Sequence, residues 1–186
     1  MKEKLTEQDF IEVSKKIGCD VASIKAFCEV EAPNGGFLPD GQVTILFERH
    51  VFYRLTKGKF FKTNPDVCNP KAGGYGPSGQ HQHDRLAIAV KLDRESALKS
   101  CSWGKFQIMG FNYKSAGFAS LQEFINSMSV NERNQLLAFV NFIINNNLGQ
   151  YLRSKNWVKL AYYYNGSDYK KNNYDVKLAK AYLKYS

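Results

Sequence analysis

A glutamate, Glu31, closes an apolar, helix-like run over residues 24–31, and a segment that breaks helices follows immediately. The C-terminal end of a helix carries partial negative charge and apolar neighbours disfavour ionisation, so both effects raise the pKa of a carboxyl group there. A carboxyl group that keeps its proton near neutral pH is the acid that cleavage of a glycosidic bond requires. Taken alone, the pattern is more typical of a solvated glutamate in a last helical turn.

Glycosidic cleavage also uses a second carboxylate, which stabilises the oxocarbenium-like transition state or activates water. Glu48 is the candidate, because it follows Glu31 by 17 residues across a predicted β-hairpin that returns the chain towards its start. The neighbouring Arg49 would favour the ionised form of Glu48. Asp40, in the predicted turn, is a weaker candidate, and Glu29 is expected to be solvated on another helix face. A competing interpretation makes Glu48 the N-cap or first-turn residue of a helix.

The elements that must position these residues are mostly helical. Apolar spacings of three and four, with capping residues such as Thr6 and Asp20, predict helices over residues 8–17, 20–31, 48–55, 84–99, 121–127, 131–145, 157–164 and 175–184. Between residues 35 and 47, the Pro39-Asp40-Gly41 turn signature and the β-formers that follow it predict a short β-hairpin. Residues 58–83 form a long irregular loop, which is either functional or a simple insertion.

The composition fits a globular protein. Of 186 residues, 44% are apolar, and no apolar stretch approaches the roughly 20 residues needed to span a bilayer. Charged residues occupy the N-terminus where a signal peptide would be apolar, so we expect the protein to be held in the cytosol unless another component releases it. The four cysteines lack metal-binding spacing and are expected to be free thiols, and the three histidines predict no metal site.

Positive charge is concentrated near the C-terminus. The net charge is +9, and residues 153–186 carry eight lysines or arginines against two aspartates. Such a balance suits an anionic polymer, which could be nucleic acid, a lipid headgroup surface or a bacterial envelope. The predicted helix over residues 175–184 is amphipathic, with Lys177, Lys180 and Lys184 opposite Val176, Ala179 and Leu183. Helices of this kind can bind membranes, although packing by the apolar face is the favoured interpretation.

Three segments, in order, carry a family resemblance. They are Val30-Glu31-Ala32-Pro33-Asn34-Gly35, Ser102-Trp103-Gly104-Lys105-Phe106-Gln107-Ile108 and Tyr162-Tyr163-Tyr164-Asn165-Gly166. Together they resemble the lysozyme-like superfamily of goose-type lysozymes and soluble lytic transglycosylases. Phe37-Leu38-Pro39-Asp40-Gly41, Ile45-Leu46-Phe47-Glu48-Arg49-His50 and Tyr174-Asp175-Val176-Lys177 bring the match closer to the phage-type N-acetylmuramidase (endolysin) family, over about residues 20–184. Ala32 departs from the family, which has serine there, so the hydrogen bond of that hydroxyl is missing.

The resemblance implies an α+β, predominantly α-helical, lysozyme-like fold with a small β-hairpin after the catalytic helix. It implies one domain over residues 1–186 without a separate wall-binding module. It makes Glu31 the catalytic acid, places the segment around Gln107 along a sugar groove and sets Tyr164 and Asn165 against the acid. The Gln107 amide can bind sugar hydroxyl or acetamido groups. Phe106, Met109 and Tyr164 are expected to supply apolar faces for pyranose rings, whereas Trp103 is expected in the core.

The implied activity is that of an endolysin, a peptidoglycan hydrolase that cuts the β-1,4 bond between N-acetylmuramic acid and N-acetylglucosamine. It needs no metal or cofactor. The implied setting is the host cytoplasm, followed by the periplasm and cell wall after holin-type release. A monomer is expected, with possible contact between the basic C-terminal helix and an anionic outer-membrane surface.

Several alternatives stay open at the level of sequence. A lytic transglycosylase would give 1,6-anhydro products and needs no second carboxylate. A secreted antibacterial effector, a catalytically inactive wall-binding domain and a basic nucleic-acid-binding module are the others. No nucleic-acid motif is recognised, so nucleic acid is not the expected partner. Retaining and inverting mechanisms differ in the separation of the two carboxyl groups, which spacing along a chain does not give.

Overall fold

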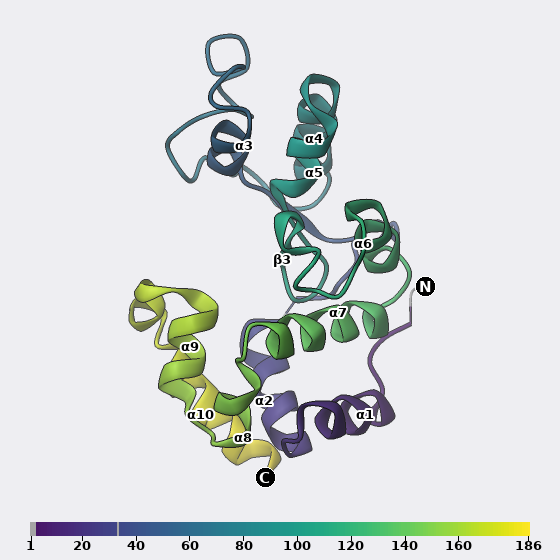
Figure 1. Cartoon of the computed structure of the whole chain (residues 1–186), viewed down its shortest axis with the longest axis vertical. Coiled ribbons are helices and arrows are strands. Elements are labelled where there is room, and N and C mark those ends of the chain that lie inside the picture. The colour runs from purple at the N-terminus through teal and green to yellow at the C-terminus, as the bar shows by residue number, and fades with distance from the viewer. Residues whose placement is uncertain (1–2, 33) are drawn as a thin grey trace.

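The computed structural model describes residues 3–32 and 34–186, without the side chains of residues 167 and 168. Pro33, in the segment predicted to break the helix after Glu31, lies outside the described residues, as do Met1 and Lys2. Figure 1 shows helix α7 crossing the middle of the molecule, with α3, α4 and α5 above it and α1, α2, α8, α9 and α10 below.

The described chain is predominantly helical with one small sheet, which confirms the predicted fold class. The helices are α1 (Glu7–Ile17), α2 (Val21–Glu31), α3 (Arg49–Leu55), α4 (Gln80–Leu92), α5 (Arg94–Lys99), α6 (Leu121–Met128), α7 (Glu132–Asn145), α8 (Gly149–Arg153), α9 (Trp157–Asn165) and α10 (Tyr174–Tyr185), with 3-10 turns η1 (Gly110–Asn112) and η2 (Ser167–Asn172). The strands are β1 (Ile45–Phe47), β2 (Cys101–Trp103) and β3 (Ile108–Met109). No helix among the described residues is long and apolar enough to cross a membrane.

The first two helices begin and end as their sequences predict. The Thr6 side chain accepts a hydrogen bond from the backbone N–H of Asp9, whose carboxylate accepts from the Thr6 backbone in return. Asp20 caps α2 by accepting from the backbone N–H of Ser23. Gly18 ends α1 in the left-handed conformation, with φ of 79°, which favours glycine. These local signals fix the start of α2, the helix that carries Glu31 at its far end.

The predicted β-hairpin over residues 35–47 is present in a short form. Phe37 and Val43 form an antiparallel bridge. The backbone N–H of Thr44 donates to the Gly36 carbonyl oxygen at 3.0 Å, and that of Leu38 donates to the Gln42 carbonyl oxygen at 2.8 Å. The prediction did not include the partner of the strand that follows. Strand β1 pairs with β2, which is buried along its whole length, with Ile45 opposite Trp103 and Phe47 opposite Cys101, and β2 also pairs with β3.

The region predicted as one helix over residues 84–99 forms two. Asp93 ends α4 with an extended backbone and caps α5 by accepting from the backbone N–H of Ser96. Helix α4 also starts earlier than predicted, at Gln80, so His81 and His83 lie in its first turn and not in the irregular loop. Gln82 between them is buried and bonds to the backbone of the preceding loop. The irregular loop therefore ends at residue 79.

Helix α10 does not pack by its predicted apolar face. Leu178 and Ala181 are its buried residues, and the helix lies along α2. Val176 and Leu183 are 47% and 74% exposed. An exposed ion pair between Lys184 and Glu29 of α2, at 2.7 Å, accompanies this orientation. The face formed by Val176, Ala179 and Leu183, which was expected in the core, therefore lines a groove against α9 that is open to solvent.

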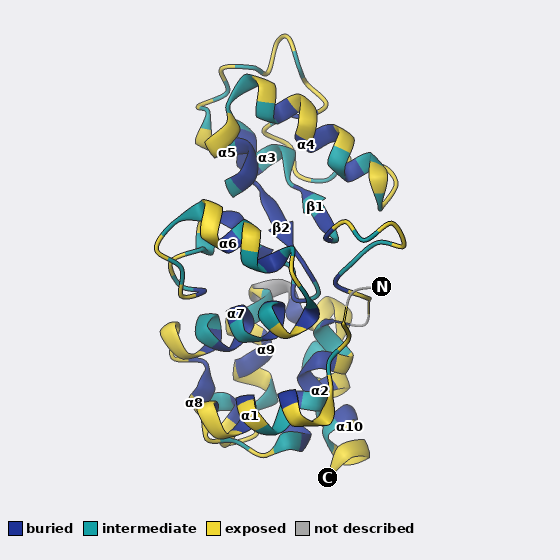
Figure 2. Ribbon diagram, turned by 90° about the vertical axis from the view of Figure 1, so that its right-hand side faces the viewer, coloured by how far each residue is buried: buried dark blue, intermediate teal, exposed yellow. Residues whose placement is uncertain are grey.

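The core is centred on α7, where buried residues of several elements meet (Figure 2). The Phe139 ring of α7 stacks on Phe27 of α2, with ring centroids 4.6 Å apart. Its other stacking partner is Phe106, at 4.7 Å. These stacked rings join the end of the acid-bearing helix to the β2–β3 turn, so the relative positions of the two segments depend on the core.

Candidate active site

Glu31 is the last residue of α2, half-buried at the edge of the core. Burial raises the pKa of Glu31 from its ordinary value of 4.5 to about 7. Two features oppose this shift without cancelling it. Asn165 Nδ2 donates to Glu31 Oε1 at 2.8 Å, and the positive charge of Lys177 favours the ionised carboxylate. The site therefore holds a carboxyl group that is protonated in a large fraction of molecules near neutral pH.

Two cavities meet at Glu31. The first, here called the Glu48 cavity, has a volume of about 560 Å³ and includes both Glu31 and Glu48 in its lining. The second, the Ser78 cavity, measures about 210 Å³ and includes Glu31, Lys105 and Ser78. Both are also lined by Gln107. A polymer that occupied both cavities would pass Glu31 at their junction, which is where a bond to be cleaved must lie.

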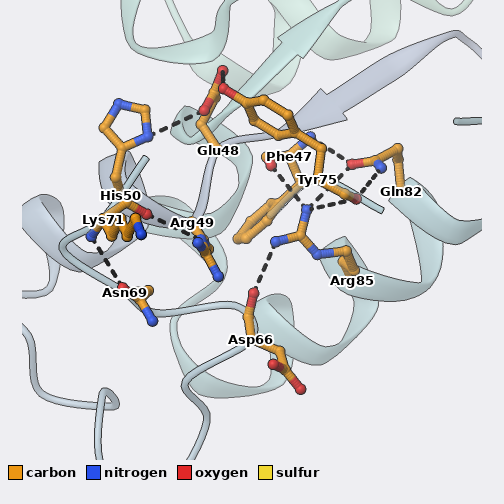
Figure 3. A network of polar contacts seen from close by, with 10 residues as sticks. All are labelled: Phe47, Glu48, Arg49, His50, Asp66, Asn69, Lys71, Tyr75, Gln82 and Arg85. Atoms are coloured by element: carbon orange, nitrogen blue, oxygen red, sulfur yellow. Dashed lines mark hydrogen bonds and ion pairs between the residues drawn. The ribbon is translucent and has the colours of Figure 1, made fainter. Parts of the chain in front are cut away.

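Glu48 occupies the N-cap position of α3, as the competing interpretation predicted, but its side chain makes no capping hydrogen bond. Its carboxylate is directed to other partners (Figure 3). Oε1 accepts from the Tyr75 hydroxyl at 3.2 Å, and Oε2 lies 3.1 Å from His50 Nδ1. The carboxylate thus stands in the same cavity as Glu31 and is free of any helix-capping role.

Arg49 does not pair with Glu48. Its Nε donates to the carbonyl oxygen of Lys71, 3.0 Å away in the long loop. Figure 3 shows the Arg49 side chain pointing into that loop, while His50 points to Glu48. Arg49 follows Glu48 in the sequence and was expected to pair with it. In the structure the Arg49 side chain points away, and the carboxylate lies beside His50.

Gln107 lies in the predicted groove, but its amide is already engaged by the chain. Oε1 accepts from Ser102 Oγ at 2.7 Å, and Nε2 donates to the carbonyl oxygen of Gly104 at 2.8 Å. Its backbone is left-handed, with φ of 48°. These bonds fix the orientation of the amide and leave one N–H and one lone pair for a sugar. Met109 also lines the Glu48 cavity, and its contact with a pyranose ring stays a prediction.

Phe106 and Tyr164 have structural roles that the predicted sugar contacts did not include. Phe106 reaches the cavity wall but is only 2% exposed, because its ring stacks on Phe139. Its ring belongs to the core, which corrects the expectation of a sugar-facing surface. Tyr164 donates its hydroxyl proton to the Phe106 carbonyl oxygen at 3.1 Å and packs edge-on against Phe27. Trp103 is buried, as expected.

The remaining acidic candidates lie elsewhere. Hydrogen bonds from Gln42 lower the pKa of Asp40, which lines neither cavity at Glu31. Glu29 pairs with Lys184 and also lines neither of them. The structure therefore brings Glu48, and not Asp40, to the cavity of Glu31. Among the described residues, no group of three or more His, Cys, Asp or Glu side chains is arranged to hold a metal ion.

Helix α7 holds the two groove segments together through two buried polar residues. Gln135 donates to the Gly36 carbonyl oxygen at 3.3 Å and accepts from the Lys105 N–H at 2.7 Å. Glu132 accepts from the Gly36 N–H at 3.0 Å. A Cβ atom at Gly36 would collide with the Gln135 amide, and one at Gly104 would lie 2.7 Å from it. Both glycines are needed for this close approach, which fixes the walls of the Ser78 cavity.

Sequence reasoning missed Gln135, His50 and Tyr75. In the sequence, Gln135 is one of several polar residues of an amphipathic helix, and His50 lies near the start of a helix. Neither position indicates a role in the site. Tyr75 lies 27 residues from Glu48, inside the irregular loop. The weak signal was an aromatic residue among glycines and prolines in a loop too long for a simple connection.

Replacing Asn165 with alanine should move the alkaline limb of the pH–rate profile to higher pH. The Asn165 bond favours the ionised form of Glu31, so its loss raises the pKa of Glu31 further. The maximal rate should fall about tenfold, because the acid loses an orienting contact. The measurement is kcat/KM on purified peptidoglycan as a function of pH. Asn145→Ala is the matched control, since the Asn145 side chain donates to the Ser115 carbonyl oxygen and lines neither cavity. An alkaline limb that stays in place would contradict this coupling.

Comparisons with known proteins agree with this geometry. The family model described as "Muramidase: N-acetylmuramidase" matches residues 20–186. A solved structure titled "Crystal structure of Burkholderia AP3 phage endolysin" is similar to the chain, with 41% sequence identity and a TM-score of 0.91. The similarity covers 97% of this chain and 70% of that one. A search of curated proteins finds no significant match.

Proposed function

Because this chain belongs to the N-acetylmuramidase family, we propose that Glu31 is the acid with which it cuts peptidoglycan. The chain is a glycoside hydrolase, and peptidoglycan is its substrate. The bond cut is the β-1,4 linkage between N-acetylmuramic acid and N-acetylglucosamine. The observation that carries this role is the position of Glu31 at the junction of two cavities, with its pKa raised to about 7.

The hydrogen bond from Asn165 favours Oε2 of Glu31 as the reactive oxygen. Asn165 Nδ2 donates to Oε1, which acts as the acceptor, so in this proposal the carboxyl proton resides on Oε2. Sugar units of the glycan occupy the Glu48 cavity and the Ser78 cavity on either side. Oε2 transfers its proton to the glycosidic oxygen as that bond breaks, and the leaving sugar departs with a free hydroxyl group.

Glu48 is the second carboxylate of this proposal. It shares the larger cavity with Glu31 and accepts a hydrogen bond from Tyr75. A carboxylate held in this position is suited to stabilise the positive charge of the oxocarbenium-like state or to activate water. One cavity thus contains both carboxyl groups that the reaction uses.

Product analysis tests the reaction directly. Mass spectrometry of muropeptides from digested peptidoglycan should find reducing N-acetylmuramic acid ends. A lytic transglycosylase would instead give 1,6-anhydro ends, 18 Da lighter by the loss of one water molecule. The family model describes a muramidase, which favours hydrolysis. A digest dominated by anhydro ends would overturn the assignment of water as the acceptor.

We also propose that the exposed groove between α9 and α10 contacts an anionic outer-membrane surface. The groove is lined by the apolar side chains of Val158, Val176 and Leu183 and by Lys155 and Lys180. Apolar residues flanked by lysines are the composition that binds the interface of an anionic membrane. Release from the cytosol by a holin and action as a monomer complete the proposal, and gel filtration tests the latter.

Leu183→Ser should weaken binding to vesicles that contain phosphatidylglycerol, by about threefold to tenfold, because Leu183 is 74% exposed. Co-sedimentation of the protein with anionic vesicles, compared with phosphatidylcholine vesicles, provides the measurement. Val130→Ser is the control, since Val130 is 51% exposed and does not line the groove. Hydrolysis of isolated peptidoglycan should be the same in all three proteins. Equal vesicle binding by the two variants would argue against the groove.

A further inference from the structure

We propose that His50 and Tyr75 are positioning residues that hold the two oxygens of Glu48. We also propose that the irregular loop preceding α4 places Tyr75 next to Glu48. The inference rests on the proposed role of Glu48 and deepens it. Neither residue is placed in contact with the reacting sugar. Their effect on the reaction passes through the orientation and charge of the carboxylate.

The contacts around Glu48 are specific to each oxygen. Tyr75 donates to Oε1 at 3.2 Å, while Oε2 and His50 Nδ1 lie 3.1 Å apart. Both of the latter atoms are buried, and neither has a conventional hydrogen bond within the described part of the chain. An imidazole nitrogen without a proton would present a lone pair to the carboxylate, so Nδ1 must carry hydrogen for the pair to be favourable. Glu48 is thereby held between the Tyr75 hydroxyl, which donates to Oε1, and the His50 ring, which lies against Oε2.

The loop is fixed to the strand that precedes Glu48. Arg85 is buried and donates to the carbonyl oxygens of Phe47 at 3.2 Å, Tyr75 at 3.4 Å and Asp66 at 2.8 Å. Gln82 donates to the Tyr75 carbonyl oxygen at 2.7 Å and accepts from the Phe47 N–H at 3.1 Å. Arg85 and Gln82, both in α4, thus each bind the backbone of Tyr75 and that of Phe47, the residue before Glu48 (Figure 3). This shared attachment fixes the position of the Tyr75 backbone relative to Glu48.

A second attachment holds the loop from the other side. Arg49 donates to the Lys71 carbonyl oxygen, and its guanidinium group lies against Gly74. Gly74 has a φ of 66°, and a Cβ atom there would collide with the Arg49 guanidinium group. The residue directly before Tyr75 therefore needs to be glycine. The sequence predicted that Arg49 would favour the ionised form of Glu48. In the structure Arg49 acts on Glu48 indirectly, because it holds the loop that carries Tyr75.

This arrangement gives each oxygen of the Glu48 carboxylate its own polar neighbour. The Glu48 side chain is only 16% exposed, so few other groups can reach it. The Tyr75 hydrogen bond and the His50 contact restrict the carboxylate to one orientation. Burial lowers the pKa of the neighbouring Arg85, and the Glu48 carboxylate opposes that effect.

A double-mutant cycle tests whether the two residues act through Glu48. Tyr75→Phe and His50→Ala should each lower kcat for peptidoglycan by roughly tenfold with little change in KM, because a preorganised contact to the charge is lost. His50→Asn, whose amide N–H can replace Nδ1–H, should recover part of the rate. In the Glu48→Gln background the same substitutions should change kcat by less than about twofold. Tyr53→Phe is the control, because Tyr53 packs against Phe61 and lines neither cavity.

The outcomes separate this inference from the proposed function. If Glu48→Gln itself turns over at the wild-type rate, the role of Glu48 is wrong and the inference falls with it. If Glu48→Gln is slow but Tyr75→Phe and His50→Ala still lower its kcat tenfold, Glu48 is retained and the positioning role is overturned. Thermal unfolding of each variant identifies any loss of rate that comes from a damaged fold.

Discussion

Replacement of Glu31 by glutamine is expected to lower kcat for peptidoglycan by about 10²- to 10⁴-fold, the usual contribution of a general acid. Glutamine has nearly the same shape as a protonated glutamate and can still accept the Asn165 hydrogen bond. It has no acidic proton to give to the leaving oxygen, so KM should change little while kcat falls. Initial rates of reducing-end release from purified peptidoglycan measure the effect. Wild-type turnover by this variant would remove Glu31 from the mechanism.

The same variant should be more stable than the wild type in alkaline solution. Burial raises the folded-state pKa of Glu31 from 4.5 to about 7, so the folded protein binds this proton more tightly than the unfolded chain. The associated stability is fully present below about pH 4.5 and is lost as pH rises through about 7. Glutamine does not titrate, so it avoids this loss, which is about 3 kcal/mol at most. Thermal unfolding at pH 4 and pH 8 measures the difference and also establishes that the inactive variant is folded.

Replacement of Glu48 by glutamine is the second large effect, with an expected loss of about 10²-fold in kcat. In the proposed mechanism the charge of Glu48 stabilises a positive transition state only while the glycosidic bond breaks, so substrate binding should be largely preserved. The Tyr75 hydroxyl can still donate to the new amide oxygen, and the local structure should persist. Kinetics on purified peptidoglycan measure kcat and KM separately.

The matched control for Glu48 is Asp40→Asn. Asp40 was the rival carboxylate on sequence grounds, but it bonds to Gln42 and lines neither cavity. Its replacement should leave turnover unchanged. If instead Asp40→Asn were slow and Glu48→Gln were normal, the second role would belong to Asp40. If both were normal, the substrate itself would have to stabilise the charge.

Much of this site could be predicted from sequence because its signals are local. Thr6 and Asp20 are capping residues whose hydrogen bonds reach only three residues along the chain, so they mark helix starts without tertiary context. The position of Glu31 at the end of α2 follows from the same periodicity. Resemblance over several ordered segments then identified the family, which the matching model confirms.

Features that depend on distant segments were predicted less well. The predicted hairpin is present around Phe37 and Val43, but the sequence did not predict that strand β1 pairs with β2, more than 50 residues further along the chain. The packed face of α10 is formed by Leu178 and Ala181 and not by Val176 and Leu183. The apolar spacing of the sequence is compatible with either face, and packing against α2 determines which one is buried. An amphipathic pattern indicates how much of a helix surface is apolar, but the element that packs against the helix determines which part of that surface is buried.

The sequence by itself predicted Glu31 as the acid, and it determined the placement of Glu31 at a helix end, the helical class and the family. Only the tertiary structure decided that Glu31 and Glu48 line one cavity, and that Asp40 and Arg49 stand apart from it. It also decided which groups hold Glu48, because His50 and Tyr75 reach it from α3 and from a loop fixed by Arg85. The physical reason is that a pKa and a hydrogen-bond partner depend on burial and on distances through space, whereas a sequence records only the order of residues along the chain.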